Sequence, residues 1–366
     1  MGSTPLKVAV WGTGGIGSIS IHTIHERPDL DLVGVWVYTD AKVGRDAGEL
    51  ANGTPIGLAA TNDVDAILAL QPDCVVYAAM GPEREAGVVP DYVRILEAGV
   101  NVVSTTSTSA IYPPNYDADH HARVSAAAKV GGVSFYASGI EPGFAADQLP
   151  VLLATQSGVV SRVYATEMAL YDDYPVEFIM KDGLGFGRPL DFEPGIATPG
   201  AIRASWAGPV RYIADSLGIE LDDIAERFEM AATDETLEVA CGTIPAGTCG
   251  AVRIQCVGIV GGNEAIIVEH VTRMGPKVAP EWPIGDFPIT YRIEIDGEPG
   301  IRCEMGLTVD DVAEAGIAEM SSGAGAMVAT AMRVVNAIPY VVAAESGFLG
   351  ADDLPLTVPK TAYRPA

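Results

Sequence analysis

Short apolar runs alternate with longer amphipathic stretches through residues 1–150. The apolar runs have the composition of strands buried on both faces of a parallel sheet, and they lie at 6–11, 32–37, 73–78, 100–104 and 133–137. Helical patterns fill the intervals: one helix begins at Ile16, a second is capped by Asn62 or Asp63, a third opens at Pro90 and a fourth covers 116–129. Repeated strand–helix units of this length predict an α/β domain with a doubly wound parallel sheet.

The pattern changes after Gly158, where the strands become longer. They are predicted at 159–170, at three places within 237–274, and in a hairpin made of 289–295 and 300–306. Asp296-Gly297 is a favoured turn pair and is predicted to close that hairpin. Helical segments are predicted within 199–230. Long, mostly antiparallel strands predict a second domain of α+β type built on one sheet.

These patterns divide the chain into a first domain at 1–150, a second at 151–321 and an extended arm at 350–366. The helix-like segment 322–345 is rich in alanine, glycine and valine, and a kink is predicted at Pro339. Because small residues permit close packing, this segment is predicted to return to the first domain.

The first strand runs directly into a glycine-rich loop whose residues are predicted to hold a dinucleotide: Gly12, Thr13, Gly14, Gly15, Ile16 and Gly17. The spacing G-x-G-x-x-G has a physical reason at each glycine. Gly12 permits a tight turn, Gly14 lets a pyrophosphate approach the backbone, and Gly17 lets helix and strand pack closely. The phosphates would lie on the free N–H groups of the helix N-terminus. A glycine-rich turn without a ligand is the alternative.

The loop after the second strand is expected to contact the adenosine ribose of that dinucleotide. Its candidate residues are Tyr38, Thr39, Lys42 and Arg45. Tyr38 stands where NAD enzymes usually carry a carboxylate, and the two cations suit a 2′-phosphate, so the sequence favours NADP. Asp40 keeps NAD possible. Ordinary surface charge is the alternative for Lys42 and Arg45.

Two further strand ends are expected at the same edge of the sheet. Small or flexible residues follow the third strand, namely Ala79, Met80 and Gly81, and hydroxyls follow the fourth, namely Ser104, Thr105 and Thr106. The first set would let the cofactor approach the backbone. The second set offers hydrogen bonds to a nicotinamide carboxamide or a substrate. For each hydroxyl the alternative is a bond to nearby backbone groups.

Glu141 is the sharpest acid–base candidate, because it lies in the crossing between the two domains. Its alternative is an acid that stabilises a helix N-terminus. Tyr171, at the end of a long strand, is the second candidate proton donor, and Lys181 is a third unless it is simply solvated. His270 lies in the middle of a strand and is interpreted as a hydrogen-bonded core histidine.

The glycine-rich stretch 183–189 is predicted to form a mobile lid with an apolar lining. Leu184 and Phe186 would provide that lining, and Phe144 from the crossing is a third predicted substrate contact. The expected substrate is a small, largely apolar molecule held between the two domains.

Composition narrows the possible partners. The 366 residues are 48% hydrophobic and 19% charged, with a net charge of −26, which argues against nucleic acid and anionic membranes. No apolar run is expected to approach the roughly 18 residues of a membrane-spanning helix. The chain enters its first strand without a leader pattern, so a cytoplasmic location is expected. The five cysteines form no C-x-x-C pair, and no metal site is predicted.

Five stretches together resemble a known family: 12–17, 42–50, 139–144, 185–187 and 329–339. The chain resembles the dihydrodipicolinate-reductase-like oxidoreductases, in the branch that contains 2,4-diaminopentanoate dehydrogenase and the native amine dehydrogenases. The resemblance implies a nicotinamide cofactor, hydride transfer to a C=O or C=N carbon, and a homodimer formed through the second sheet. Asn336, in the last stretch, joins the predicted cofactor contacts.

Two departures from the family pattern affect the expected chemistry. The His-His-x-x-Lys stretch of true dihydrodipicolinate reductase is missing, which argues against that activity. The amine dehydrogenases carry a glutamate shortly after the fourth strand, whereas 105–112 here contains hydroxyls and no acid. Reductive amination therefore requires that Glu141 take over that role. A carbonyl reductase is the alternative enzyme, and a non-catalytic NADP-binding sensor is the alternative from another class.

Overall fold

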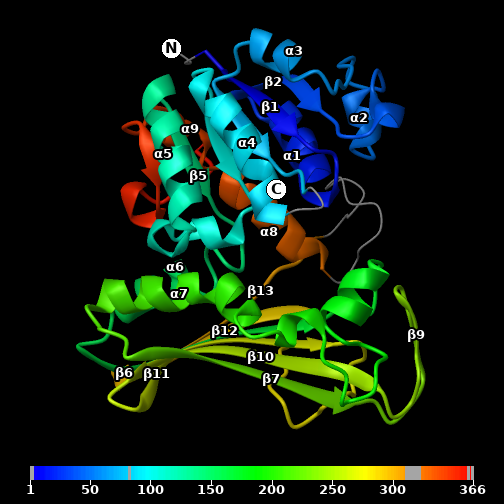
Figure 1. Ribbon diagram of the computed structural model, residues 1–366, viewed down its shortest axis with the longest axis vertical. Helices are drawn as coiled ribbons and strands as arrows, with labels where there is room; N and C mark the ends of the chain where they lie inside the picture. Colours follow the sequence, from blue (N-terminus) through cyan, green and yellow to red (C-terminus); the bar gives the residue numbers. More distant parts are fainter. Residues whose placement is uncertain (1–3, 81–83, 310–322, 361–362, 364–366) are drawn as a thin grey trace. The chain divides into compact units, whose positions relative to one another are not determined.

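The computed structural model describes residues 4–80, 84–309, 323–360 and 363, and it divides into two compact units (Figure 1). Of the described residues, the first unit contains 4–80, 84–140, 309, 327–360 and 363, and the second contains 141–308 and 323–326. The boundary falls between Ile140 and Glu141 instead of near residue 150. Gly81 lies outside the described residues.

The first unit is built on a six-stranded sheet in the order β14-β5-β4-β3-β1-β2. Its strands are β1 (Leu6–Trp11), β2 (Leu30–Trp36), β3 (Cys74–Tyr77), β4 (Asn101–Ser104), β5 (Ser134–Ala137) and β14 (Gly347–Leu349). Every pair of neighbours in this sheet is parallel. This confirms the predicted doubly wound α/β architecture, with the glycine loop at the carboxyl end of β1.

Helices cover both faces of this sheet. The helices α4 (Arg84–Glu97) and α5 (Ala118–Gly131) pack on one face, where Tyr92, Ile95 and Val124 are completely buried. The helices α1 (Gly15–Glu26) and α9 (Ile338–Ala343) pack on the other. The short helices α2 (Ala47–Leu50) and α3 (Val64–Ala69) complete the unit, and α3 is capped by Asp63 as predicted.

Two helix predictions in this unit are wrong. Pro90 does not open α4 but lies inside it, where it lacks the N–H that would continue the helical hydrogen bonds. The segment after residue 322 is not one kinked helix but two, α8 (Ala324–Val335) and α9, which are interrupted at Asn336 and Ala337. Pro339 lies in the first turn of α9, where no N–H is needed.

The stretch Ala324–Ala343 has a mean hydropathy of 1.5 and is long enough to cross a membrane by length and composition alone. The expectation that no apolar run approaches that length is therefore wrong. Its apolar residues have another use, because Val334, Val335, Ile338 and Val341 are completely buried in the core of the first unit.

The second unit is built on a six-stranded sheet in the order β13-β12-β6-β11-β10-β7. Its strands are β6 (Val159–Leu170), β7 (Asp223–Ala232), β10 (Cys249–Val260), β11 (Asn263–Arg273), β12 (Ile289–Glu298) and β13 (Ile301–Gly306). Only the central pair β6–β11 is parallel among these neighbours. The mostly antiparallel second sheet is confirmed. A separate ribbon pairs β8 (Leu237–Val239) with β9 (Gly242–Ile244).

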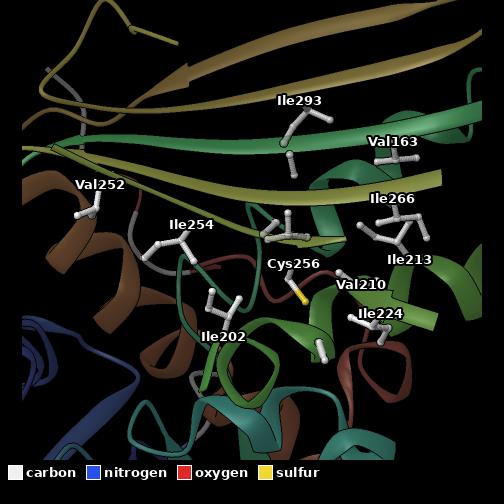
Figure 2. Packing of buried hydrophobic residues seen from close by; sticks show 14 of the residues in the cluster. Val163, Ile202, Val210, Ile213, Ile224, Val252, Ile254, Cys256, Ile266 and Ile293 are labelled. Carbon is white, nitrogen blue, oxygen red and sulfur yellow. The ribbon is translucent and has the colours of Figure 1, made fainter. Parts of the chain in front are cut away.

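One face of the second sheet is covered by α7 (Ala201–Leu217), with α6 (Gln148–Ala154) beside it. Alternate residues of the strands, including Val163, Ile254 and Ile293, pack in one cluster with Ile202 and Ile213 of α7 (Figure 2). These side chains form the apolar core of the unit, so any charged residue at an equivalent strand position faces α7 as well.

Two further predictions need correction. Residues 223–230 form most of strand β7, not helix, because the segment pairs along β10 from Asp223 to Ala232. The β12–β13 hairpin exists, but Asp296 and Gly297 extend β12 along β6 instead of making the turn. The turn is completed by Pro299 and Gly300.

Candidate active site

The glycine loop of the first unit has the geometry that a pyrophosphate requires. Gly12 has a φ of +105°, and a Cβ there would lie 3.0 Å from the Ala79 backbone. A Cβ on Gly17 would lie 2.1 Å from the carbonyl oxygen of Gly12, so α1 and β1 pack closely at that point. Nothing lies within 4 Å of the corresponding position on Gly14, which is exposed at the N-terminus of α1. The loop therefore leaves free backbone where an anion would bind.

Lys42 is the residue of the second loop that reaches the glycine loop. Its Nζ donates to Thr13 Oγ1 at 2.9 Å and to the Thr13 carbonyl at 3.4 Å. Tyr38, Thr39 and Arg45 are exposed, and Tyr38 is 74% accessible. The structure thus brings one of the two predicted cations to the dinucleotide loop.

A hydrogen bond connects the loop after β3 with the loop after β4. The hydroxyl of Thr106 donates to the carbonyl of Ala79 at 3.0 Å, while Met80 is exposed and Thr105 is half-buried. The prediction that Ser104 contacts the cofactor is wrong. Its side chain is completely buried. Its hydroxyl forms a hydrogen bond with the Tyr92 hydroxyl at 2.8 Å and accepts one from the Thr106 N–H at 3.1 Å.

The prediction for Asn336 is also wrong. Its side-chain oxygen accepts a hydrogen bond from Nη1 of Arg27 at 2.8 Å, and Arg27 follows the C-terminal end of α1. A helix of 12 residues is about 18 Å long, so Asn336 lies near the opposite end of α1 from the glycine loop. Its role is to hold Arg27, which is also paired with Asp29.

In the second unit, six side chains gather on the α7-facing side of the sheet and are called here the acid cluster: Glu141, Glu167, Tyr171, Trp206, His270 and Tyr291. Glu141 is partly accessible and accepts a hydrogen bond from Trp206 Nε1 at 3.2 Å. Burial and then the negative charge of Glu167 raise the pKa of Glu141 to about 8, against the opposing effects of His270 and Trp206. Near neutral pH this carboxyl therefore holds a proton.

Glu167 and His270 form the centre of the acid cluster. They are direct neighbours on β6 and β11, and His270 Nε2 lies 3.3 Å from Glu167 Oε1. The other ring nitrogen, Nδ1, is 2.8 Å from the Thr272 hydroxyl. Burial lowers the pKa of His270, but the charges of Glu167 and Glu141 and the hydrogen bond with Glu167 outweigh this effect and raise it.

Tyr171 lies in the same cluster, one residue beyond β6. Its hydroxyl forms a hydrogen bond with Glu167, and its ring stacks on Tyr174 with centroids 5.6 Å apart. Burial, followed by the charge of Glu167, raises the pKa of Tyr171 well above its ordinary value. The phenol therefore stays protonated and acts as a hydrogen-bond donor. The structure brings Glu141 and Tyr171 together, while their catalytic roles stay predictions.

Tyr291 faces Glu167 from the opposite side. It is the direct partner of Glu167 on β12 and is only 2% exposed. Burial and the charges of Glu167, Tyr171 and Glu141 raise its pKa far above the ordinary value. Within the described part of the chain its hydroxyl has no hydrogen-bond partner.

The predicted lid is wrong in its main feature. Phe186 is completely buried in the core of the second unit, so it cannot contact a substrate. Gly185 and Gly187, with φ of +92° and +73°, turn the chain so that the ring points inward, and the Gly187 N–H donates to the Cys249 carbonyl at 2.8 Å. Leu184 and Phe144 are half-buried. Lys181 is paired with Glu177 at 2.9 Å, so it is not placed in the acid cluster.

Sequence reasoning missed Glu167, Trp206 and Tyr291, and it interpreted His270 as a core residue. A signal was present, because the alternation through β6 places Glu167 on the same face as Val163 and Ala165. A carboxylate at a core-facing position needs a partner. The sequence does not show which distant residue supplies it.

Comparison with known proteins places this geometry in a family. The model of the dihydrodipicolinate reductase N-terminal domain matches residues 6–111, and that of the 2,4-diaminopentanoate dehydrogenase C-terminal domain matches residues 144–363. An amine dehydrogenase of Streptomyces virginiae is 37% identical over 361 residues, which cover 96% of each chain. The 2,4-diaminopentanoate dehydrogenase of Acetoanaerobium sticklandii is 23% identical, over 96% of this chain and 94% of its own.

The fold agrees with these matches. The solved structure of an amine dehydrogenase from Mycobacterium smegmatis superposes with a TM-score of 0.75, covers 98% of this chain and 97% of its own, and is 20% identical. The chain is thus a dehydrogenase or reductase of the nicotinamide-dependent type, and it belongs to the 2,4-diaminopentanoate and amine dehydrogenase branch of the dihydrodipicolinate-reductase-like oxidoreductases.

Proposed function

We propose that this enzyme interconverts an amine with the corresponding ketone or aldehyde, and that Glu141 is its acid–base residue. The observation that carries the proposal is the protonation of Glu141 near neutral pH. This carboxyl is partly accessible and lies beside the ion pair of His270 and Glu167. A general acid works best when its pKa lies near the working pH. The relatives named as dehydrogenases of amines support the same chemistry.

The role of Glu141 follows from the steps of reductive amination. Ammonia adds to the carbonyl carbon and gives a carbinolamine, whose hydroxyl must leave as water. The Glu141 carboxyl donates the proton for that departure and becomes a carboxylate next to the new iminium cation. A bound nicotinamide cofactor supplies the hydride that reduces the iminium carbon to the amine. In the reverse direction the carboxylate accepts a proton from the water that attacks the iminium.

The other members of the acid cluster hold Glu141 in this role. Trp206 donates to one carboxyl oxygen and fixes its orientation. The positive charge of His270 and the negative charge of Glu167 act on Glu141 in opposite directions, so the pair tunes its proton affinity. The aromatic rings of Tyr171, Tyr174 and Trp206 favour a substrate whose remaining surface is apolar.

NADP is the proposed cofactor, and NAD is the alternative. The backbone of Gly14 and the N-terminus of α1 would bind the pyrophosphate. The Lys42 ammonium on the glycine loop would bind the 2′-phosphate, since no acid directly follows β2 to accept the ribose hydroxyls. That the enzyme is a cytoplasmic homodimer stays a prediction from the sequence.

The test is oxidation of NADPH and NADH with a panel of aldehydes and ketones, with and without ammonium. The wild type should oxidise the cofactor only with ammonium, and Glu141→Gln should lower kcat on the order of 100-fold to 1,000-fold. Glu294→Gln, in an exposed ion pair with Arg302, is the matched control and should keep full activity. Oxidation that ignores ammonium would instead establish a carbonyl reductase. Binding of NADPH with no turnover on any carbonyl would establish a sensor.

A further inference from the structure

Tyr291 presents an unused hydroxyl to the acid cluster. The residue is 98% buried on β12 beside Glu167, and its hydroxyl has no partner within the described residues. A buried hydroxyl without a hydrogen bond has lost its contacts with water and gained nothing in return, so it destabilises the fold. The charges of Glu167, Tyr171 and Glu141 all act on this hydroxyl, so the three groups lie near it. An unsatisfied group in such surroundings indicates that a small polar species completes the site.

The chemistry of the surrounding groups selects the kind of species. The charged groups that act most strongly on Glu141 are Glu167, Asp147 and His270, so negative charges outnumber positive ones. Carboxylates accept hydrogen bonds, and a phenol oxygen can accept one as well as donate one. A carbonyl oxygen only accepts hydrogen bonds, so it cannot satisfy the Glu167 carboxylate, which also only accepts. A small cation with several N–H donors matches them.

We propose that Tyr291, with Glu141 and Glu167, forms the ammonium-binding site of the reaction. This inference rests on the proposed function and names the ligand of that same site. One N–H of ammonium donates to the Tyr291 oxygen, and others donate to the carboxylate of Glu167 and to the carbonyl oxygen of the Glu141 carboxyl. The carboxylate of Glu167 takes a proton from ammonium, and the ammonia so formed attacks the carbonyl carbon.

The proton removed from ammonium balances the proton that Glu141 gives up in the same turnover. The Glu141 carboxyl donates its proton to the carbinolamine hydroxyl, which leaves as water, and the carbon–nitrogen bond becomes an iminium. Transfer of the proton from Glu167 to Glu141 then restores the starting state, and the iminium carbon would accept the hydride of a bound nicotinamide cofactor. In sum, one carbonyl, one ammonium ion and one NAD(P)H give one neutral amine, one water and one NAD(P)⁺, so atoms and charge balance.

The experiment measures KM for ammonium and KM for the carbonyl separately in wild type and Tyr291→Phe. Removal of one hydrogen bond to a cation should raise KM for ammonium on the order of 10-fold to 100-fold. KM for the carbonyl and Kd for NADPH should stay unchanged. The thermal midpoint should not fall, because the deleted hydroxyl has no partner within the described residues.

Tyr164→Phe is the matched control on the other face of the same sheet. Its hydroxyl accepts hydrogen bonds from Arg253 at 3.3 Å and Gln255 at 3.5 Å. This variant should lower the thermal midpoint and leave KM for ammonium unchanged, the reverse of Tyr291→Phe. An unchanged KM for ammonium in Tyr291→Phe, or a rise confined to the KM for the carbonyl, would overturn this inference alone. Absence of ammonium-dependent turnover in the wild type would overturn the proposed function and this inference together.

Discussion

The Nε2 atom of His270 lies 3.3 Å from Oε1 of Glu167, and the two residues are direct neighbours on the parallel strands β11 and β6. Pairing of the two strands therefore holds the two side chains next to each other. The pair acts on Glu141 with two opposite charges: Glu167 raises the pKa of Glu141, and His270 lowers it. Removal of one partner should therefore shift the pKa of Glu141 in a direction that can be stated in advance.

His270→Gln should shift the pH dependence of reductive amination. In the wild type the rate should fall as the pH rises through about 8, because Glu141 then loses the proton that the departing water needs. Loss of the positive charge of His270 raises the pKa of Glu141 further, so the falling limb should move to higher pH by about half a unit or more. The measurement is kcat/KM for the carbonyl at saturating ammonium between pH 6 and 10. His22→Gln, a partly exposed residue of α1 beside Glu26, should leave the limb in place. A limb that moves to lower pH would contradict the assignment.

Glu141→Gln should stabilise the fold at alkaline pH. The folded-state pKa of about 8 lies above the ordinary value of 4.5, so the fold favours the protonated carboxyl. The cost of ionising it therefore grows as the pH rises from about 4.5 to 8 and is complete above that range. The amide removes this cost, which is on the order of 1–3 kcal/mol once partial exposure reduces the value of about 1.4 kcal/mol per pKa unit. Thermal unfolding at pH 5 and pH 9 should show a larger gain at pH 9, and Glu294→Gln should show no such difference.

Alanine at two glycines of the loop should separate folding from cofactor binding. Gly17→Ala places a Cβ 2.1 Å from the Gly12 carbonyl oxygen and should destabilise the protein by about 2 kcal/mol or more. Gly14→Ala meets nothing within 4 Å and should leave the thermal midpoint unchanged. The same methyl group should weaken NADPH binding at least 10-fold, because it occupies space that the pyrophosphate needs. Titration of each variant with NADPH tests the pair, and normal binding by Gly14→Ala would refute the loop assignment.

Lys42→Met should discriminate between the two cofactors. Since the Lys42 ammonium lies on Thr13 of the glycine loop, its loss should weaken NADPH binding on the order of 10-fold to 30-fold and NADH binding much less. Lys129→Met, an exposed lysine in the last turn of α5, is the control and should leave the binding of both cofactors unchanged. Equal weakening of both cofactors would assign Lys42 to the pyrophosphate instead of the 2′-phosphate.

The sequence predicts the first unit well because the patterns that define its strands and helices involve residues close together in the chain. Apolar runs, the cap at Asp63 and the glycine spacing each depend on residues that are close in the chain, and the structure confirms the parallel sheet and the close approach at Gly17. Strand β7 was interpreted as helix because Ala, Glu, Arg and Met all favour helices. Pairing with β10 outweighed that preference, which only the tertiary structure reveals.

The acid cluster was predicted only in part for the same reason. Glu141 and Tyr171 stand out by position in the sequence. His270 is predicted only as a hydrogen-bonded core histidine, and its partner Glu167 lies on a strand far away in the sequence, which local patterns do not identify. Phe186 was misjudged because glycines on both sides suggested mobility, whereas their positive φ angles direct the ring into the core. Asn336 followed family resemblance alone, and its actual partner is Arg27.

The first sheet is completed only at the end of synthesis, because its last strand comes near the C-terminus. Its sixth strand, β14, and the covering helix α9 emerge from the ribosome after the whole of the second sheet, although they complete the core around β4 and β5. Until then the nascent chain carries an unpaired edge on β5 and an uncovered apolar face, which are the features that chaperones bind and that aggregate in truncated proteins. A fragment ending at Ile140 should therefore fail as an isolated nucleotide-binding module, and fusing residues 324–360 to it is the way to restore one.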